Sequence, residues 1–110
     1  MKFALLIQWD ENQPTWTDAD EERAVLKHRD FHRELGARFL AGERLRPERE
    51  ATRVSVRGGV RKLVDGPFTE TKEVLGGFYL IECATRDEAL ELATRCPASE
   101  YGTVELREIG

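Results

Sequence analysis

Short alternations of hydrophobic and polar residues predict strands along this chain, and two longer segments between them predict helices. Residues 2–9 and 78–84 are apolar at successive positions, so both faces of each predicted strand are apolar, as in strands that are covered on both sides. Residues 38–45, with Gly42 as a weak point, and residues 103–109 predict two further strands.

The two predicted helices are marked by caps as well as by spacing. The first covers residues 17–35, opens with a Thr-x-x-Asp capping-box pattern and ends before a glycine. Its apolar face has the spacing i, i+4, i+7, i+11 and includes His28. The second covers residues 85–95 and opens with a Thr-x-x-Glu pattern of the same kind.

Between these elements, residues 52–57 and 60–64 predict an antiparallel hairpin that turns at Gly58 and Gly59. Without the hairpin, the element order is βαββαβ, which predicts an α+β, ferredoxin-like sandwich with an extra β-hairpin. Both helices then cover one side of a sheet whose central strands are apolar on both faces. We therefore expect a homodimer, in which a second copy covers the open sheet face.

Composition narrows the class of protein. The 110 residues predict a single domain, and the mixture of 40% hydrophobic and 35% charged residues is typical of a globular protein. A net charge of −4 argues against nucleic-acid binding. The apolar start of the chain is too short to cross a membrane, and the two isolated cysteines are typical of a cytoplasmic protein. No glycine-rich phosphate-binding motif is present, which excludes a phosphate cradle of that kind, and we predict no cofactor.

One block of sequence resembles a known family. Residues 65–79 read DGPFTETKEVLGGFY, which is similar to the signature of the YCII-related, or DGPF-domain, family. The resemblance implies a ferredoxin-like fold that dimerises in the manner of dimeric α/β-barrels, with a cleft lined by the DGPF segment. It also implies a small enzyme with an aspartate in a polar cleft, and some members accompany extracytoplasmic-function sigma factors.

Asp65 is the first candidate catalytic residue. It follows a predicted strand and precedes Gly-Pro, so its carboxylate is held at a sharp turn, where partial burial would suit it to general acid or base chemistry. The alternative is an Asx turn, in which the carboxylate only accepts hydrogen bonds from the backbone beyond it.

The polar segment after the turn offers candidates for substrate binding. Glu70 and Lys72 would share one face of an extended segment, and Lys72 could neutralise an anionic substrate. The alternative is a solvated surface loop with an ion pair.

His28 is the second candidate catalytic residue, and three aromatic residues are candidates for the pocket wall. His28 and His32 are four residues apart, a metal-ligand spacing, but the pattern lacks the glutamate of H-E-x-x-H, so we predict no metal. Trp9 and Tyr79 lie on the predicted central strands and would shape the cleft, and Phe68 would either contact the substrate or anchor the turn. The alternative for His28 and for these rings is packing in the core.

Two functional hypotheses follow. The first is a dimeric, small-molecule-binding protein or small enzyme with acid/base chemistry at Asp65. The second is a non-catalytic module that senses a ligand or binds a regulatory protein, such as an extracytoplasmic-function sigma factor.

Overall fold

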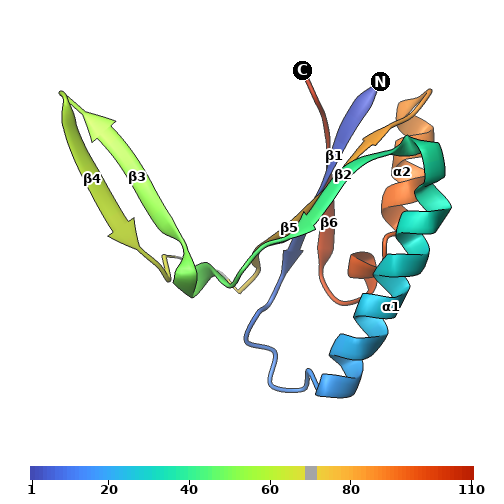
Figure 1. Ribbon diagram of the computed structural model, residues 1–110, viewed down its shortest axis with the longest axis horizontal. Helices are drawn as coiled ribbons and strands as arrows, with labels where there is room; N and C mark the ends of the chain where they lie inside the picture. The colour runs from blue at the N-terminus through green and yellow to red at the C-terminus, as the bar shows by residue number, and fades with distance from the viewer. Residues whose placement is uncertain (69–71) are drawn as a thin grey trace.

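The computed structural model describes residues 1–68 and 72–110, which form an antiparallel sheet, two α-helices and a separate two-stranded sheet (Figure 1). Within these residues the larger sheet has the strand order β2-β5-β1-β6, which is consistent with a ferredoxin-like α+β fold. The strands are β1 (Lys2–Trp9), β2 (Phe39–Arg44), β3 (Thr52–Arg57), β4 (Val60–Asp65), β5 (Val74–Glu82) and β6 (Thr103–Glu108); the α-helices are α1 (Asp18–Leu35) and α2 (Arg86–Arg95), and the 3₁₀ turns are η1 (Gly36–Arg38), η2 (Glu48–Glu50) and η3 (Pro97–Glu100).

The prediction for β5 was wrong at its start. We expected a strand over residues 78–84, with the two glycines leading into it, but β5 begins at Val74 and includes them. Gly77 pairs with Ile7 of β1 and with Arg44 of β2. The glycines therefore belong to the paired strand, although glycine is a poor strand former.

Both helices cover the same face of the larger sheet, and the core lies between the two layers (Figure 1). Phe3 and Leu5 of β1 and Ile81 of β5 are fully buried, and Phe31 and Leu35 of α1 pack against them. Among the described residues, neither helix combines the length and apolar character needed to cross a bilayer.

The opposite face of the sheet has no helix on it. Ala4 and Leu6 of β1 lie beside Leu80 and Phe78 of β5, and all four are only partly buried. These residues alternate along their strands with the core residues, so they point away from the helices. We refer to the surface formed by these four side chains as the open face.

Strands β3 and β4 form a hairpin that is separate from the larger sheet (Figure 1). Gly58 and Gly59 have positive φ angles of 55° and 77°. A tight turn of the primed type needs positive φ at both central residues, which glycine adopts without a steric penalty.

The N-terminal cap of α1 gives a first testable prediction. The Oγ1 atom of Thr17 accepts a hydrogen bond from the Asp20 amide at 3.1 Å, and the Thr17 amide donates to Asp20 Oδ2 at 2.9 Å. Thr17→Ala is therefore expected to lower the free energy of unfolding by about 1 kcal/mol, as measured by urea denaturation. Thr15→Ala, in the exposed loop before the helix, is the control, and an equal loss in both variants would contradict the cap's contribution.

Candidate functional site

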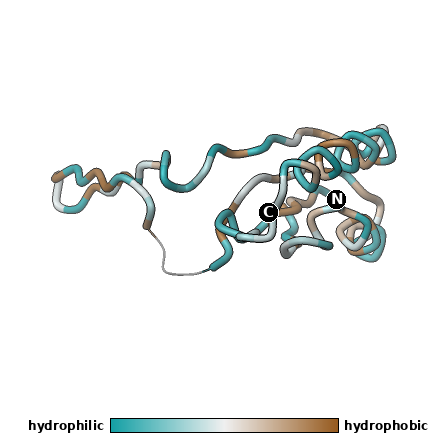
Figure 2. Tube along the Cα trace, turned by 90° about the horizontal axis from the view of Figure 1, so that it is seen from below, coloured by the Kyte–Doolittle hydropathy of each residue, from teal (hydrophilic) through white to brown (hydrophobic). Residues whose placement is uncertain are grey.

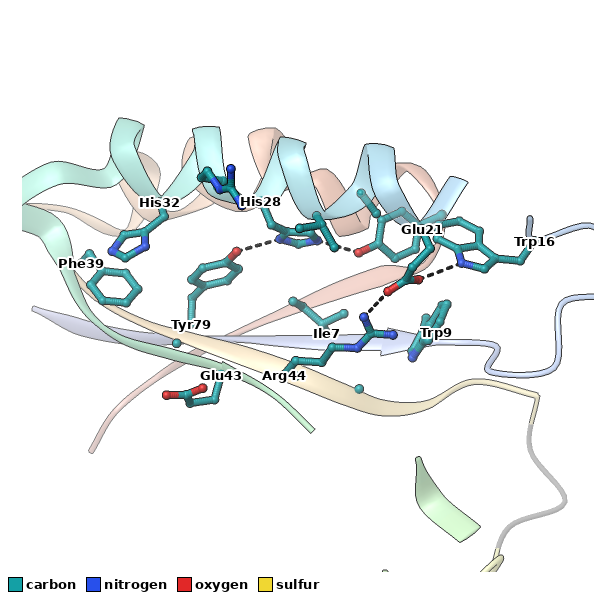
Figure 3. A pocket seen from close by; sticks show the side chains of 17 residues that line it. Ile7, Trp9, Trp16, Glu21, His28, His32, Phe39, Glu43, Arg44 and Tyr79 are labelled. Carbon is teal, nitrogen blue, oxygen red and sulfur yellow. Dashed lines mark hydrogen bonds and ion pairs between the residues drawn. The ribbon is translucent and has the colours of Figure 1, made fainter. Parts of the chain in front are cut away.

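A pocket of about 430 Å³ lies between α1 and the β1–β2–β5 part of the sheet (Figure 3). Helix α1 forms one wall, the strands form the other, and the turn before β6 closes one end with Tyr101. Aromatic rings supply much of the surface, and several contact one another; the Trp16 and Tyr101 ring centroids, for example, are 5.0 Å apart. The aromatic lining residues are Trp9, Trp16, Phe39, Tyr79 and Tyr101.

His28 lies in the pocket between two tyrosine hydroxyl groups (Figure 3). Its Nδ1 atom is 2.7 Å from the Tyr79 hydroxyl oxygen, and its Nε2 atom is 2.6 Å from the Tyr101 hydroxyl oxygen. A neutral imidazole has one donor and one acceptor nitrogen, so one tyrosine accepts a hydrogen bond from His28 and the other donates one to it. The three side chains form a continuous chain of hydrogen bonds across the pocket.

Burial keeps this chain of groups neutral. It lowers the pKa of His28, and the nearby Arg44 cation lowers it further, whereas Glu21 acts in the opposite direction. Burial also raises the pKa of Tyr101 to about 12 and moves the pKa of Tyr79 well above its usual range. At neutral pH, His28 is therefore a base that can accept a proton, and both tyrosines keep their hydroxyl protons.

A charge pair lies at the same end of the pocket as Trp16 and Tyr101. Glu21 of α1 forms an ion pair with Arg44 of β2 and accepts a 2.9 Å hydrogen bond from the indole N–H of Trp16. The hydrogen bond from Arg44 holds the pKa of Glu21 below its usual value. The guanidinium carbon of Arg44 also lies 5.9 Å from the centroid of the Trp9 ring. This end of the pocket can therefore interact with a polar or anionic group on a ligand.

The position of Trp9 depends on Gly76. A Cβ atom at Gly76 would lie 2.5 Å from Cδ1 and Nε1 of the Trp9 indole, closer than real Cβ contacts allow. The glycine is needed at this position because the tryptophan packs over it.

The structure brings together three of the seven predicted site residues. His28, Trp9 and Tyr79 all line the pocket, from α1, β1 and β5 respectively. His28 lies on the helix face that its spacing predicted, where it is hydrogen-bonded as well as packed. His28 is therefore packed and hydrogen-bonded, as the packing interpretation predicts, and it also lines a pocket, as the catalytic interpretation requires.

Asp65 does not lie in this pocket, so the expectation that it shares a cleft with His28 is not met within one chain. It is the last residue of β4, is exposed, and pairs with Thr52, whose hydroxyl donates to Asp65 Oδ1 at 2.9 Å. The reason is topological: the chain leaves the sheet after β2, and Asp65 belongs to the pairing of the β3–β4 hairpin.

Phe68 and Lys72, two other candidates from the DGPF segment, are also outside the pocket. The Phe68 amide donates to Glu48 Oε1 at 3.2 Å, and the Arg53 guanidinium lies 4.2 Å from the centroid of the Phe68 ring. These contacts hold the segment near the base of the hairpin. Lys72 is exposed and does not line the pocket. Glu70 falls outside the described residues.

Tyr101, Arg44 and Glu21 also line the pocket, and the sequence did not predict them as site residues. Tyr101 is in the turn between η3 and β6, where no periodicity indicates which way a side chain points. Arg44 and Glu21 come from a predicted strand end and from an acidic first helical turn, and each has an ordinary structural explanation there. Only the three-dimensional arrangement identifies them as pocket residues.

The lowered pKa of His28 predicts a pH dependence of stability. The unfolded chain binds a proton near the ordinary value of 6.5, whereas the folded protein takes it up only at lower pH. The free energy of unfolding should therefore be independent of this group above about pH 6.5 and fall as the pH drops from there to the folded-state pKa.

Urea titrations at a series of pH values measure this effect. The free energy of unfolding of the wild type minus that of His28→Phe should fall as the pH drops through that window. The variant lacks the imidazole, so its own stability does not depend on this titration. A difference that stays constant would contradict the lowered pKa.

The fold and the pocket together define a class: an α+β sandwich in which an imidazole is held between two phenols in an aromatic pocket of small-molecule size. Comparison with known proteins gives the family. The YCII-related domain matches residues 1–110, and the chain belongs to this family, as its DGPF block predicted.

The chain is also similar to a curated protein and to a solved structure. An uncharacterised protein of Rhizobium meliloti (strain 1021) is 38% identical over 96 residues, which cover 84% of this chain and 77% of that protein. The chain is also similar in fold, with a TM-score of 0.59, to 5-chloro-2-hydroxyhydroquinone dehydrochlorinase of Burkholderia phenoliruptrix AC1100, solved in complex with 2,5-dihydroxybenzoquinone. That match covers 100% of this chain and 94% of the other, and at 14% identity it is a likeness of fold alone.

Proposed function

We propose that this protein is a small enzyme that binds a planar, hydroxylated ring compound next to His28 and moves a proton to or from it. The observation that carries the proposal is the neutral imidazole of His28, held between the hydroxyl groups of Tyr79 and Tyr101 in an aromatic pocket.

The pocket supports this ligand class by its size and lining. A volume of about 430 Å³ falls within the range typical of small-molecule sites. The faces and edges of Trp9, Trp16 and Tyr101 favour a flat ring over a saturated one. The fold neighbour was solved with a hydroxylated quinone, which is a compound of this class.

The chain of hydrogen bonds supplies a route for the proton. When the ligand hydroxyl binds next to Tyr101, the tyrosine passes its own proton to Nε2 of His28 and takes the ligand proton in its place. His28 becomes an imidazolium, and the ligand becomes an anion. Arg44, at the same pocket, stabilises that anion electrostatically.

Isothermal titration calorimetry with 2,5-dihydroxybenzoquinone tests the proposal, with 1,4-cyclohexanediol as the saturated control ligand. We expect saturable binding of the quinone alone, and proton uptake or release that depends on His28. Equal binding of both compounds, or of neither, would contradict the ligand class. Binding of the quinone class without turnover of any member would instead favour the ligand-sensing alternative.

We further propose that the working unit is a homodimer in which the open face of each copy covers that of the other. The apolar residues Ala4, Leu6, Phe78 and Leu80 support this assembly, because a sheet with one helical layer leaves them partly in water. Sedimentation measurements of wild type and Leu80→Asp test it, and the expected result is a dimer that the substitution dissociates.

A further inference from the structure

The β3–β4 hairpin carries exposed apolar side chains and has no core of its own. Strand register places Val54 opposite Leu63 on one face of the hairpin, with Val56, which is opposite Arg61, next along that face. The side chains of Val54, Leu63 and Val56 are 62%, 52% and 56% exposed, respectively. An isolated two-stranded hairpin is at best marginally stable in water, so a surface that covers these residues would stabilise it. Figure 2 shows the hairpin apart from the body, with hydrophobic residues along it.

The hairpin and the rest of the chain carry opposite charges. Residues 52–64 contain four basic residues and no acidic residue, giving +4. The remaining residues of the chain contain 13 basic and 21 acidic residues, giving −8. A second copy of this chain therefore offers the hairpin a surface of opposite charge. The basic residues of the hairpin are Arg53, Arg57, Arg61 and Lys62.

The hairpin is also on the side of the molecule where a second copy would be placed. In Figure 1 it projects on the side of the sheet that faces away from both helices, which is the side of the open face. That side also carries carboxylates: Glu43 pairs in register with Phe78, and Glu105, which forms an ion pair with Arg107, pairs with Leu6. Side chains that pair in this way share a face of the sheet.

We propose that the β3–β4 hairpin is an arm that clasps a second copy of this chain. Val54, Val56 and Leu63 lie against apolar surface of the other copy, and the basic side chains, including Arg61 on the same face, lie near its carboxylates. Because the contact is symmetric, each dimer contains two such arms. The inference rests on the proposed homodimer and is independent of the pocket's ligand.

Sedimentation of the full-length protein with matched substitutions tests the arm. We expect Val54→Asp to raise the dimer dissociation constant at least tenfold, because it buries a charge in the apolar contact. Leu26→Asp, at a leucine of α1 that is 54% exposed, is the control and should leave the constant unchanged. The double variant Arg57→Glu, Lys62→Glu should also weaken the dimer and reduce its dependence on salt concentration.

Hydrogen exchange gives a measurement that needs no variant. The amides of residues 52–57 and 60–65 should exchange slowly in the dimer and faster on dilution into monomer. If Leu80→Asp dissociates the dimer while Val54→Asp does not, the proposal that the hairpin clasps the second copy is wrong, and the proposed homodimer is retained. The same conclusion follows if these amides exchange freely in the dimer. If the wild type is a monomer at all concentrations, both proposals are wrong.

Discussion

His28→Phe is expected to lower the turnover of a hydroxylated ring compound by about 10² to 10⁴-fold, the usual contribution of a general acid or base. Phenylalanine fills the space between the two tyrosines, but it can neither accept a proton nor hydrogen-bond to the hydroxyl groups of Tyr79 and Tyr101. Steady-state kinetics measures the loss, and circular dichroism shows whether the fold is retained.

His28→Gln separates proton transfer from positioning. Its amide can still donate and accept hydrogen bonds, so we expect ligand affinity near that of wild type together with turnover as low as in His28→Phe. Wild-type turnover in either variant would exclude His28 as the proton-transfer group. A loss of affinity without a change in turnover would assign it to binding alone.

Leu5→Ala is expected to lower the free energy of unfolding by about 2–5 kcal/mol. Leu5 is fully buried at the centre of the sheet, where it lies beside Tyr79 of β5 and Leu106 of β6. The substitution leaves a cavity that β1, held by strands on both sides, cannot close. Urea denaturation measures the change.

Leu26→Ala is the matched control, because it removes the same atoms from a leucine that is 54% exposed on α1. We expect it to change stability by no more than about 0.5 kcal/mol. Similar losses in the two variants would contradict a core formed between the helices and β1.

Much of the larger sheet and both helices could be predicted from the sequence, because local signals agree there with the tertiary structure. Thr17 and Asp20 mark the start of α1, and the reciprocal hydrogen bonds between them are present. The glycines before residue 78 misled the prediction of β5, since strand propensity is a local property and the packing of Trp9 over Gly76 is not.

The candidate site was predictable where one element determines it. Helical spacing placed His28 toward the sheet, and strand position placed Tyr79 beneath it. Asp65 lies apart from His28 within one chain because it pairs within the hairpin, although the DGPF block is continuous in sequence with β5. Tyr101 could not be found, because it reaches His28 from 73 residues away through a turn.

The hairpin occupies the connection between β2 and β5, two strands that are neighbours in the sheet. The two ends of this connection are already close together, since the Leu45 amide donates to the Gly76 carbonyl at 2.9 Å. A tight turn could therefore replace the whole connection between β2 and β5, including the hairpin, without changing the strand order. The hairpin is therefore an insertion between two neighbouring strands, and the lining of the pocket comes from residues outside it.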